Sequence, residues 1–334
     1  MGMLKSRIYN NIAPWVNLIA KKMKLYKYMA GKRANEFFDQ PLLRLTNPYG
    51  LNDPFECSIP RELSEEIEKM YTEQGRRDEG FRDYIKNFKS YGVISLSETF
   101  DNLLMWSHYA DEHRGAVFEF SVEEGNPSSL FLFRNETSIP ESKHFGKVDY
   151  RKIRKYQGVI STEMISEIRG HYIFTKSDEW MYEKEQRFVL HYSFADIVKV
   201  NKKECENAFH CNKLDYSEFE SRSGVKAIGE DLWIDIRGSK ISAEILEAMW
   251  ILTSHMKSFF FKIIDFDRVE KIIIGCRNDK ISIEQAIKNT ENTRAAGKFY
   301  RKENFTNVLL ARPSEERFEL DFEEYRGFFL SMFT

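Results

Sequence analysis

The clearest hydrophobic pattern in the chain lies between Ser95 and Phe120. A short apolar run from Gly92 to Ser97 predicts a strand, and the apolar spacing from Leu103 to Ala110 predicts a helix. We expect Asp101 to cap this helix and Gly115 to open a second strand. The stretch therefore predicts a strand-helix-strand unit.

The helix of this unit has apolar residues on most of its surface, so we expect it to be buried. Its remaining polar groups, Ser107, His108 and the Tyr109 hydroxyl, would then need hydrogen-bond partners or a pocket. For His108 by itself, a hydrogen-bonded place in the core is the more common role than that of a base.

The rest of the chain alternates irregularly between short strands and helices, which favours an α+β fold over a doubly wound parallel sheet. A loop rich in Asn, Asp and Pro, residues 47–56, either lines a site or plugs the edge of the core. The other predicted elements are strands at 25–29, 42–46, 146–150, 233–236, 271–276 and 307–311, and helices at 153–172, 243–261 and 282–291, with polar connections at 126–144 and 201–223.

We predict two regions along the chain. Residues 1–23 form an N-terminal helical arm, because Pro14 and several asparagines weaken the alternatives of a membrane-surface helix or a targeting peptide. Residues 24–334 form a single α+β domain, with a charged helical insertion near 61–90 that we assign to a solvated face.

A second charged stretch, Tyr182–Leu190, is predicted to be a strand. Its alternation places Glu183, Glu185 and Arg187 on one face, with the two carboxylates about 6–7 Å apart. Such a pattern is often a solvated edge strand with surface salt bridges. The neighbouring aromatic residue Trp180 also suits a site for a flat cationic ring.

Composition excludes several classes of protein. Lys and Arg number 50 against 52 Asp and Glu, a formal net charge of −2, which argues against non-specific duplex binding as the main role. Four scattered cysteines indicate reduced thiols and a cytoplasmic protein, and Cys205, His210 and Cys211 match no zinc pattern, so no metal is expected. No apolar run is long enough to span a membrane.

The common cofactor and nucleophile motifs are absent, so the remaining candidate is a site centred on carboxylates. The chain has no G-x-G-x-x-G after a strand, no P-loop and no G-x-S-x-G elbow. Nothing marks a cysteine as a nucleophile, and His108 and His113 have the wrong spacing for two ligands on one helix face.

Five sequence blocks, in this order, resemble a widespread bacterial family of unknown function. The similarity extends through Ile272–Gly275. The blocks are Leu25-Tyr26-Lys27-Tyr28, Asn52-Asp53-Pro54-Phe55-Glu56, Ser95-Leu96-Ser97-Glu98, Met105-Trp106-Ser107-His108-Tyr109-Ala110 followed by Gly115, and Trp180-Met181-Tyr182-Glu183-Lys184-Glu185-Gln186-Arg187.

The order of features also resembles the ADP-ribosyltransferase fold. This resemblance implies split mixed β-sheets flanked by helices, with NAD bound in the cleft between them. It implies Glu185 as the catalytic residue, with Glu183 and Arg187 beside it, and Lys27 stands where many members have His or Arg. The NAD-binding residues implied are Tyr26, Lys27, Tyr28, Asn52, Asp53, Ser95, Ser97, Trp106, His108 and Tyr109.

A fixed carboxylate suits this chemistry, because cleavage of the nicotinamide–ribose bond develops positive charge on the ribose. The expected activity is therefore NAD-dependent ADP-ribosyl transfer to a nucleic acid (RNA or DNA) or protein, by a toxin or phage-defence effector held by an antitoxin or other inhibitory partner. The alternatives are an NAD glycohydrolase, or a non-catalytic module that binds a nucleotide or a phage component.

Overall fold

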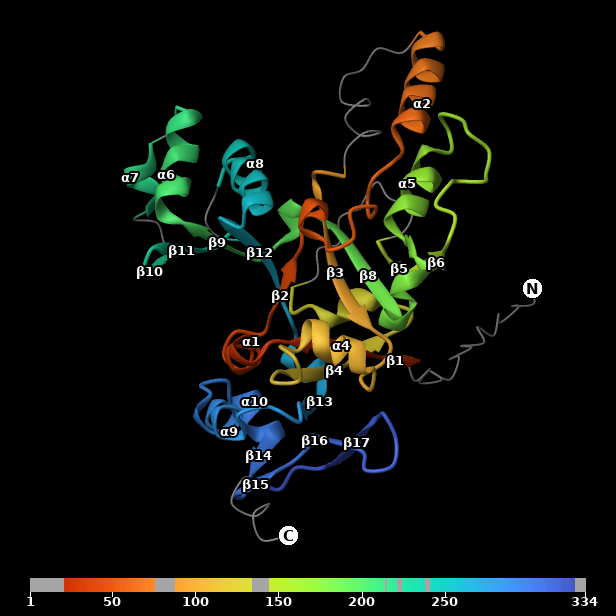
Figure 1. The fold of residues 1–334 in the computed structure, drawn as a ribbon. Helices are drawn as coiled ribbons and strands as arrows, with labels where there is room; N and C mark the ends of the chain where they lie inside the picture. Colours follow the sequence, from red (N-terminus) through yellow and green to blue (C-terminus); the bar gives the residue numbers. More distant parts are fainter. Residues whose placement is uncertain are drawn as a thin grey trace, which may run out of the picture.

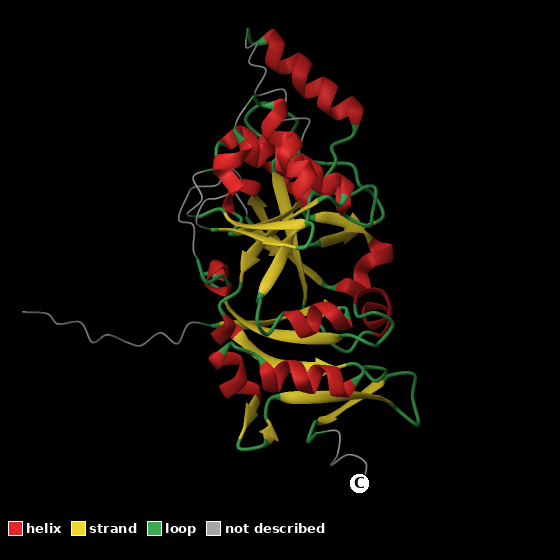
Figure 2. Cartoon of the chain, turned by 90° about the vertical axis from the view of Figure 1, so that its left-hand side faces the viewer, coloured by secondary structure: helices red, strands yellow, loops and turns green. Residues whose placement is uncertain are grey.

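Two β-sheets dominate the computed structural model, which describes residues 21–75, 88–133, 144–213, 215–220, 224–237 and 241–327 (Figures 1 and 2). The large sheet has eight strands in the order β17-β16-β13-β4-β1-β3-β8-β5, and the small sheet has five in the order β10-β11-β9-β12-β2. Strand β13 pairs with β16 in parallel, and the other pairs in these two sheets are antiparallel. The predicted α+β class with mixed sheets is confirmed.

The strands have the following bounds. Those of the large sheet are β1 (Lys22–Met29), β3 (Tyr91–Ser97), β4 (Ala116–Glu123), β5 (Phe145–Lys147), β8 (Glu185–His191), β13 (Val269–Ile274), β16 (Val308–Pro313) and β17 (Leu320–Glu324). Those of the small sheet are β2 (Leu42–Leu45), β9 (Ile197–Asn201), β10 (Val225–Ile228), β11 (Asp231–Asp235) and β12 (Ser258–Ile263). Two further pairs are β6 (Asp149–Arg151) with β7 (Thr175–Ser177) and β14 (Tyr300–Arg301) with β15 (Asn304–Phe305).

The helices pack around these sheets. Helices α6 and α8 contact β9 and β12 of the small sheet, and α1 packs on α9 (Figure 1). The helices of the described ranges are α1 (Gly31–Glu36), α2 (Arg61–Glu73), α4 (Leu103–Tyr109), α5 (Ile165–Ile173), α6 (Lys202–Cys211), α7 (Tyr216–Glu220), α8 (Ala243–Ile251), α9 (Lys280–Asn289) and α10 (Thr293–Phe299).

The large sheet splits between β1 and β3. Strand β1 is in register with β4 over eight residue pairs, but with β3 at a single pair, Tyr26 and Ser97. Beyond that pair β3 leans toward the small sheet, where Val93 forms a bridge with Thr46. A side chain spans the gap instead of backbone bonds, because Lys27 Nζ donates to the Ser95 carbonyl at 2.8 Å.

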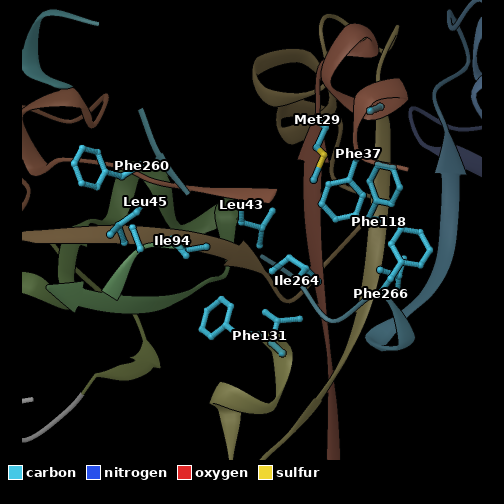
Figure 3. Packing of buried hydrophobic residues seen from close by; sticks show 14 of the residues in the cluster. Met29, Phe37, Leu43, Leu45, Ile94, Phe118, Phe131, Phe260, Ile264 and Phe266 are labelled. Carbon is cyan, nitrogen blue, oxygen red and sulfur yellow. The ribbon is translucent and has the colours of Figure 1, made fainter. Parts of the chain in front are cut away.

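One hydrophobic core runs through both sheets (Figure 3). On one side Phe37, the C-cap of α1, packs on Phe118 of β4, with ring centres 4.6 Å apart. On the other side Leu45, Ile94 and Phe260 bring strands β2, β3 and β12 together. The strands on both sides of the split therefore belong to one packed core and not to two bodies joined by a flexible hinge.

Several predicted element boundaries are wrong. The apolar stretch 243–261 is not one helix, because α8 ends at Ile251 and the aromatic run belongs to β12, where half-buried Phe259 alternates with buried Phe260. Residues 153–172 are helical only in α5. The supposed connection 201–223 contains α6 and α7, and the final predicted strand, β16, is followed by β17.

The predicted N-terminal regions are only partly tested. Residues 1–20 of the proposed helical arm lie outside the described residues, and Lys22 and Met23 belong to β1. In the predicted insertion, α2 is helical as expected, whereas 76–87 lie outside the described residues. The predicted strand at 146–150 is divided between β5 and β6.

Helix α4 also differs from its prediction. Its N-cap is Asn102, whose side chain accepts hydrogen bonds from the Leu104 and Met105 amides, and not Asp101. The helix is not sunk into the protein: Leu104 is 49% exposed, and Ser107 and His108 point to solvent. These two polar residues therefore need no buried partners.

We expect Gly115→Ala to lower the free energy of unfolding by about 1–3 kcal/mol or more, because its Cβ would lie 1.9 Å from the Met29 carbonyl oxygen. Gly170→Ala in α5 is the matched control. No atom lies within 4 Å of its added Cβ, so a gain of about 0.5–1 kcal/mol is expected. Urea unfolding of both variants measures the difference, and equal stabilities would contradict the close backbone approach.

Candidate functional site

A cavity of about 350 Å³ opens at the split between β1 and β3. Its volume is at the small end of the range for small-molecule sites. The walls come from β1, β2, the loop after β2, β3, α4, β7 and the start of β8. The lining residues are Tyr26, Lys27, Tyr28, Arg44, Thr46, Gly50, Leu51, Asn52, Glu56, Ser95, Leu96, Ser97, Met105, Tyr109, Lys176, Glu183, Glu185 and Arg187.

The two glutamates enter the cavity from a turn rather than from one strand. Residues 178–183 form a short 3-10 helix, Lys184 has a left-handed backbone with φ 44°, and β8 starts at Glu185. The predicted strand over Tyr182–Leu190 is therefore wrong for its first three residues. The Ser97 hydroxyl, which donates to the Glu183 carbonyl at 2.6 Å, fixes this turn against β3.

A buried ionic cluster forms one wall. Lys176 Nζ lies 2.9 Å from Glu56, 2.7 Å from Glu183 and 3.9 Å from Glu185. Arg187 forms two hydrogen bonds with Glu185, at 2.6 and 2.8 Å, and a further one with Glu56. All five side chains are at most 6% exposed, so water does little to screen these charges.

Neutral hydrogen-bonding groups complete the cluster. The Tyr109 hydroxyl donates to Glu183 Oε1 at 2.5 Å, and Asn52 Nδ2 donates to the Tyr109 oxygen at 2.7 Å. On the other side the Glu185 amide donates to the Tyr150 hydroxyl at 2.8 Å. The cluster thus links α4, the loop after β2 and β6 to the start of β8.

The pKa values of the cluster move in different directions. Burial acts to raise the pKa of Glu185, but the Arg187 charge and hydrogen bonds, with Lys176 and Ser95, outweigh it and lower that pKa. For Glu56 the effect of burial is larger than that of its two cations, so its pKa is raised. Burial would lower the pKa of Lys176, yet its three carboxylates raise it.

Lys27 belongs to the opposite wall of the cavity. Burial lowers the pKa of its ammonium group, and Glu185 and Glu183 only partly oppose this effect. Three carboxylates and four cationic side chains, counting Lys27 and Arg44, therefore line the same space. The cavity has one more cation than carboxylates and is rich in groups that can bind a polar ligand.

Ten of the thirteen residues expected at the site line this cavity. The three exceptions have other surroundings. Trp106 is fully buried, and its indole N–H donates to the Phe100 carbonyl at 2.7 Å. His108 is on the exposed face of α4, and Asp53 lies beside a second cavity.

Sequence reasoning missed the roles of Glu56 and Lys176, and also Arg44 and Thr46. Glu56 ends the Asn52–Glu56 block, so an acidic residue there was the available signal. Lys176 had no such signal, because only the pairing of β7 with β6 and the turn that follows bring it to the glutamates.

Comparisons with known proteins identify a similarity over one part of the chain. A family model described as "Protein of unknown function (DUF2971)" matches residues 105–188. No curated protein and no solved structure matches the chain. The matched segment contains Tyr109, Lys176, Glu183, Glu185 and Arg187, so it supplies most of the ionic cluster, while Glu56 and Lys27 lie outside it.

Two further observations concern metal binding and membrane-spanning helices. Among the residues that the structure describes, no three His, Cys, Asp or Glu side chains are grouped so as to hold a metal ion. Within the same ranges, no helix is both long and apolar enough to cross a membrane.

Arg187→Met is expected to lower the free energy of unfolding by about 3–5 kcal/mol, because Glu56 and Glu185 would remain buried without their guanidinium partner. The control is Arg312→Met, which removes an ion pair with Glu323 that is half exposed on both sides. Its expected cost is about 0–1 kcal/mol. If urea unfolding gave the same loss in free energy of unfolding for both variants, the buried cluster would contribute no more to stability than a surface ion pair.

The lowered pKa of Glu185 predicts a pH-dependent contribution to stability. Its ionised form is favoured in the folded state, so this contribution is full above the unfolded pKa of about 4.3 and is lost as pH falls through the lower folded pKa. The stability difference between wild type and Glu185→Gln should shrink on acidification below about pH 4. Exposed Glu316→Gln is the control, and a difference that grows toward acid pH would contradict the assignment.

Proposed function

We propose that the chain is an ADP-ribosyltransferase-like enzyme that binds NAD in the cavity between β1 and β3. Nicotinamide leaves, and the ADP-ribosyl group passes to a nucleic acid or protein acceptor. The observation that carries the proposal is the pair of carboxylates, Glu183 and Glu185, held beside each other at the split of the sheet by Lys176 and Arg187.

The geometry supports a role for these carboxylates toward a ribose cation. When the bond between ribose C1′ and the nicotinamide nitrogen breaks, its electron pair leaves with nicotinamide as a neutral base, and positive charge remains on the sugar. A carboxylate that is already fixed and ionised stabilises that charge with little reorganisation. No proton has to be delivered to the leaving group, so no general acid is required.

Glu185 is the residue we assign to this role. Arg187 binds both of its oxygens, and the resulting lowered pKa keeps it ionised at neutral pH. Each oxygen has more than one acceptor direction, so a ribose hydroxyl can still bind. Glu183, which the Tyr109 hydroxyl and Lys176 hold, is placed to orient the same sugar.

The walls of the cavity offer groups for the remainder of NAD. Tyr26, Tyr28 and Tyr109 provide aromatic surface, and Lys27 and Arg44 provide positive charge for phosphate. The setting that we infer for such an activity is a bacterial toxin or phage-defence effector in the cytoplasm, with an inhibitory partner protein. This setting comes from the family resemblance of the sequence blocks.

A second candidate is a nucleotide-binding module without turnover. The observation that favours it is the internal pairing of the cluster, since every carboxylate in it already has a cationic partner inside the protein. A purely structural or binding cluster would satisfy its charges in the same way.

The test mixes purified protein with NAD labelled in its adenylate half, alone and with RNA, DNA or cell lysate. Wild type should release nicotinamide and transfer label to a macromolecule. We expect Glu185→Gln to lose about 10²–10³-fold in rate, as when a fixed transition-state contact is removed. Glu316→Gln, which changes an exposed carboxylate elsewhere, should keep full activity.

Other outcomes separate the alternatives. Release of nicotinamide with label only on free ADP-ribose would indicate a glycohydrolase. Saturable NAD binding without release, in protein shown to be folded, would favour the binding module. Full activity of Glu185→Gln would exclude Glu185 from the chemistry and direct the search to Glu183.

A further inference from the structure

A second cavity of about 260 Å³ lies next to the first, and Lys176 lines both. It is formed by the loop after β2, the end of β6 with the segment that follows it, and strand β7; Figure 1 labels β6. The lining residues are Asp53, Phe55, Arg151, Lys152, Arg154, Thr175, Lys176 and Ser177.

Basic side chains dominate this second cavity. Arg151, Lys152 and Arg154 come from one short segment, and Lys155 continues it, so four of five consecutive residues are cationic. Asp53 is the single acidic residue among the lining residues, and its Oδ1 already accepts from the Phe55 amide. Arg151 is ion-paired with Asp149, and Lys176 is bound to its glutamates, so Lys152 and Arg154 give this cavity its excess of positive charge.

One of its cations has a fixed position. The Arg154 guanidinium is hydrogen-bonded to the backbone and hydroxyl of Ser58 and lies over the Tyr172 ring, 5.4 Å from its centre. Phe55 stands at the rim with 63% of its surface exposed, and Arg154 also lies 5.8 Å from that ring. An exposed aromatic ring beside a fixed cation is a usual platform for an unstacked nucleobase.

We propose that this second cavity binds one nucleotide of a single-stranded nucleic acid, with its phosphates on Arg151 and Lys152 and its base against Phe55. The inference rests on the proposed function, because it names the acceptor class of that activity. Thr175 and Ser177 add hydroxyl groups that can bind the sugar or phosphate.

The exposed ring and the basic run together favour an unpaired nucleic-acid strand over a duplex. A base in a duplex is stacked on both faces, so the Phe55 ring can reach it only if the strand is unpaired. The basic run from Arg151 to Lys155 extends along the chain beyond the cavity, as a phosphate backbone of several nucleotides requires. An acidic peptide would match the charge but not the aromatic platform.

The side chain of Lys176 lines both cavities. Lys176 Nζ is bound to Glu56 and Glu183, and its side chain is only 3% exposed. A nucleotide in the second cavity therefore lies across this lysine from the proposed ribose site. The nucleotide would lie next to the ionic cluster without displacing it.

The experiment measures fluorescence anisotropy of labelled single-stranded RNA and DNA of mixed sequence, and of the matching duplex, without NAD. We expect single strands to bind more tightly than the duplex, with a salt dependence that reflects about three phosphate contacts. Arg151→Gln with Lys152→Gln should weaken binding about tenfold and reduce the slope against log salt by about 1.4.

Variants at the rim and a matched control sharpen the test. Phe55→Ala should weaken single-strand binding about tenfold, whereas Phe55→Trp should preserve it, because stacking needs a ring and not this particular ring. Arg301→Gln with Lys302→Gln removes the same charge from an exposed turn of the pair β14–β15 and should leave binding unchanged.

Three results would overturn the inference. These are absence of single-strand binding at low salt, equal weakening by the two double variants, or an acidic peptide that competes better than an oligonucleotide. The assay omits NAD, so its outcome is separate from catalysis. Binding that depends on Phe55 with no NAD turnover would remove only the proposed activity, and NAD turnover without oligonucleotide binding would remove only this inference.

Discussion

The structure depends on the complete burial of one guanidinium group. Arg187 in β8 has no exposed surface, so its charge and its donors must all be satisfied inside the protein. It binds Glu185 on its own strand, Glu56 in the loop after β2, and the Ile173 carbonyl at the end of α5 at 2.7 Å. The start of β8, the end of α5 and the distant loop after β2 are therefore brought to one point.

The split of the large sheet has a related cause. Between β1 and β3 the backbone pairing stops after one register pair, and polar side chains take over the contact. Contacts between charged side chains need a larger distance between two strands than backbone hydrogen bonds do. The same groups that hold the strands apart also line the cavity, so support and candidate site are one feature.

Lys176 lies between two surfaces with different electrostatics. Its own charge is compensated by glutamates on the side of the first cavity, whereas the second cavity is also lined by Arg151, Lys152 and Arg154. A wall in which cations and carboxylates are closely matched suits a compact polar ligand, and a surface with an excess of cations suits a polyanion. The similarity to a family of unknown function covers Lys176 and the basic run from Arg151 to Lys155 as well as Glu183, Glu185 and Arg187.

The sequence by itself determined the local features with strong patterns. Alternation and turn chemistry, which act over a few residues, indicated the α+β class and the strand-helix-strand unit around α4. Most of the ten expected residues that line one cavity were instead implied by the resemblance of the sequence blocks to the ADP-ribosyltransferase fold. Only the tertiary structure decided which charges are buried together. Glu56 and Lys176 belong to the ionic cluster, and Trp106 and His108 do not line the cavity. Long-range strand pairing and core packing determine these neighbours, and no local pattern encodes them.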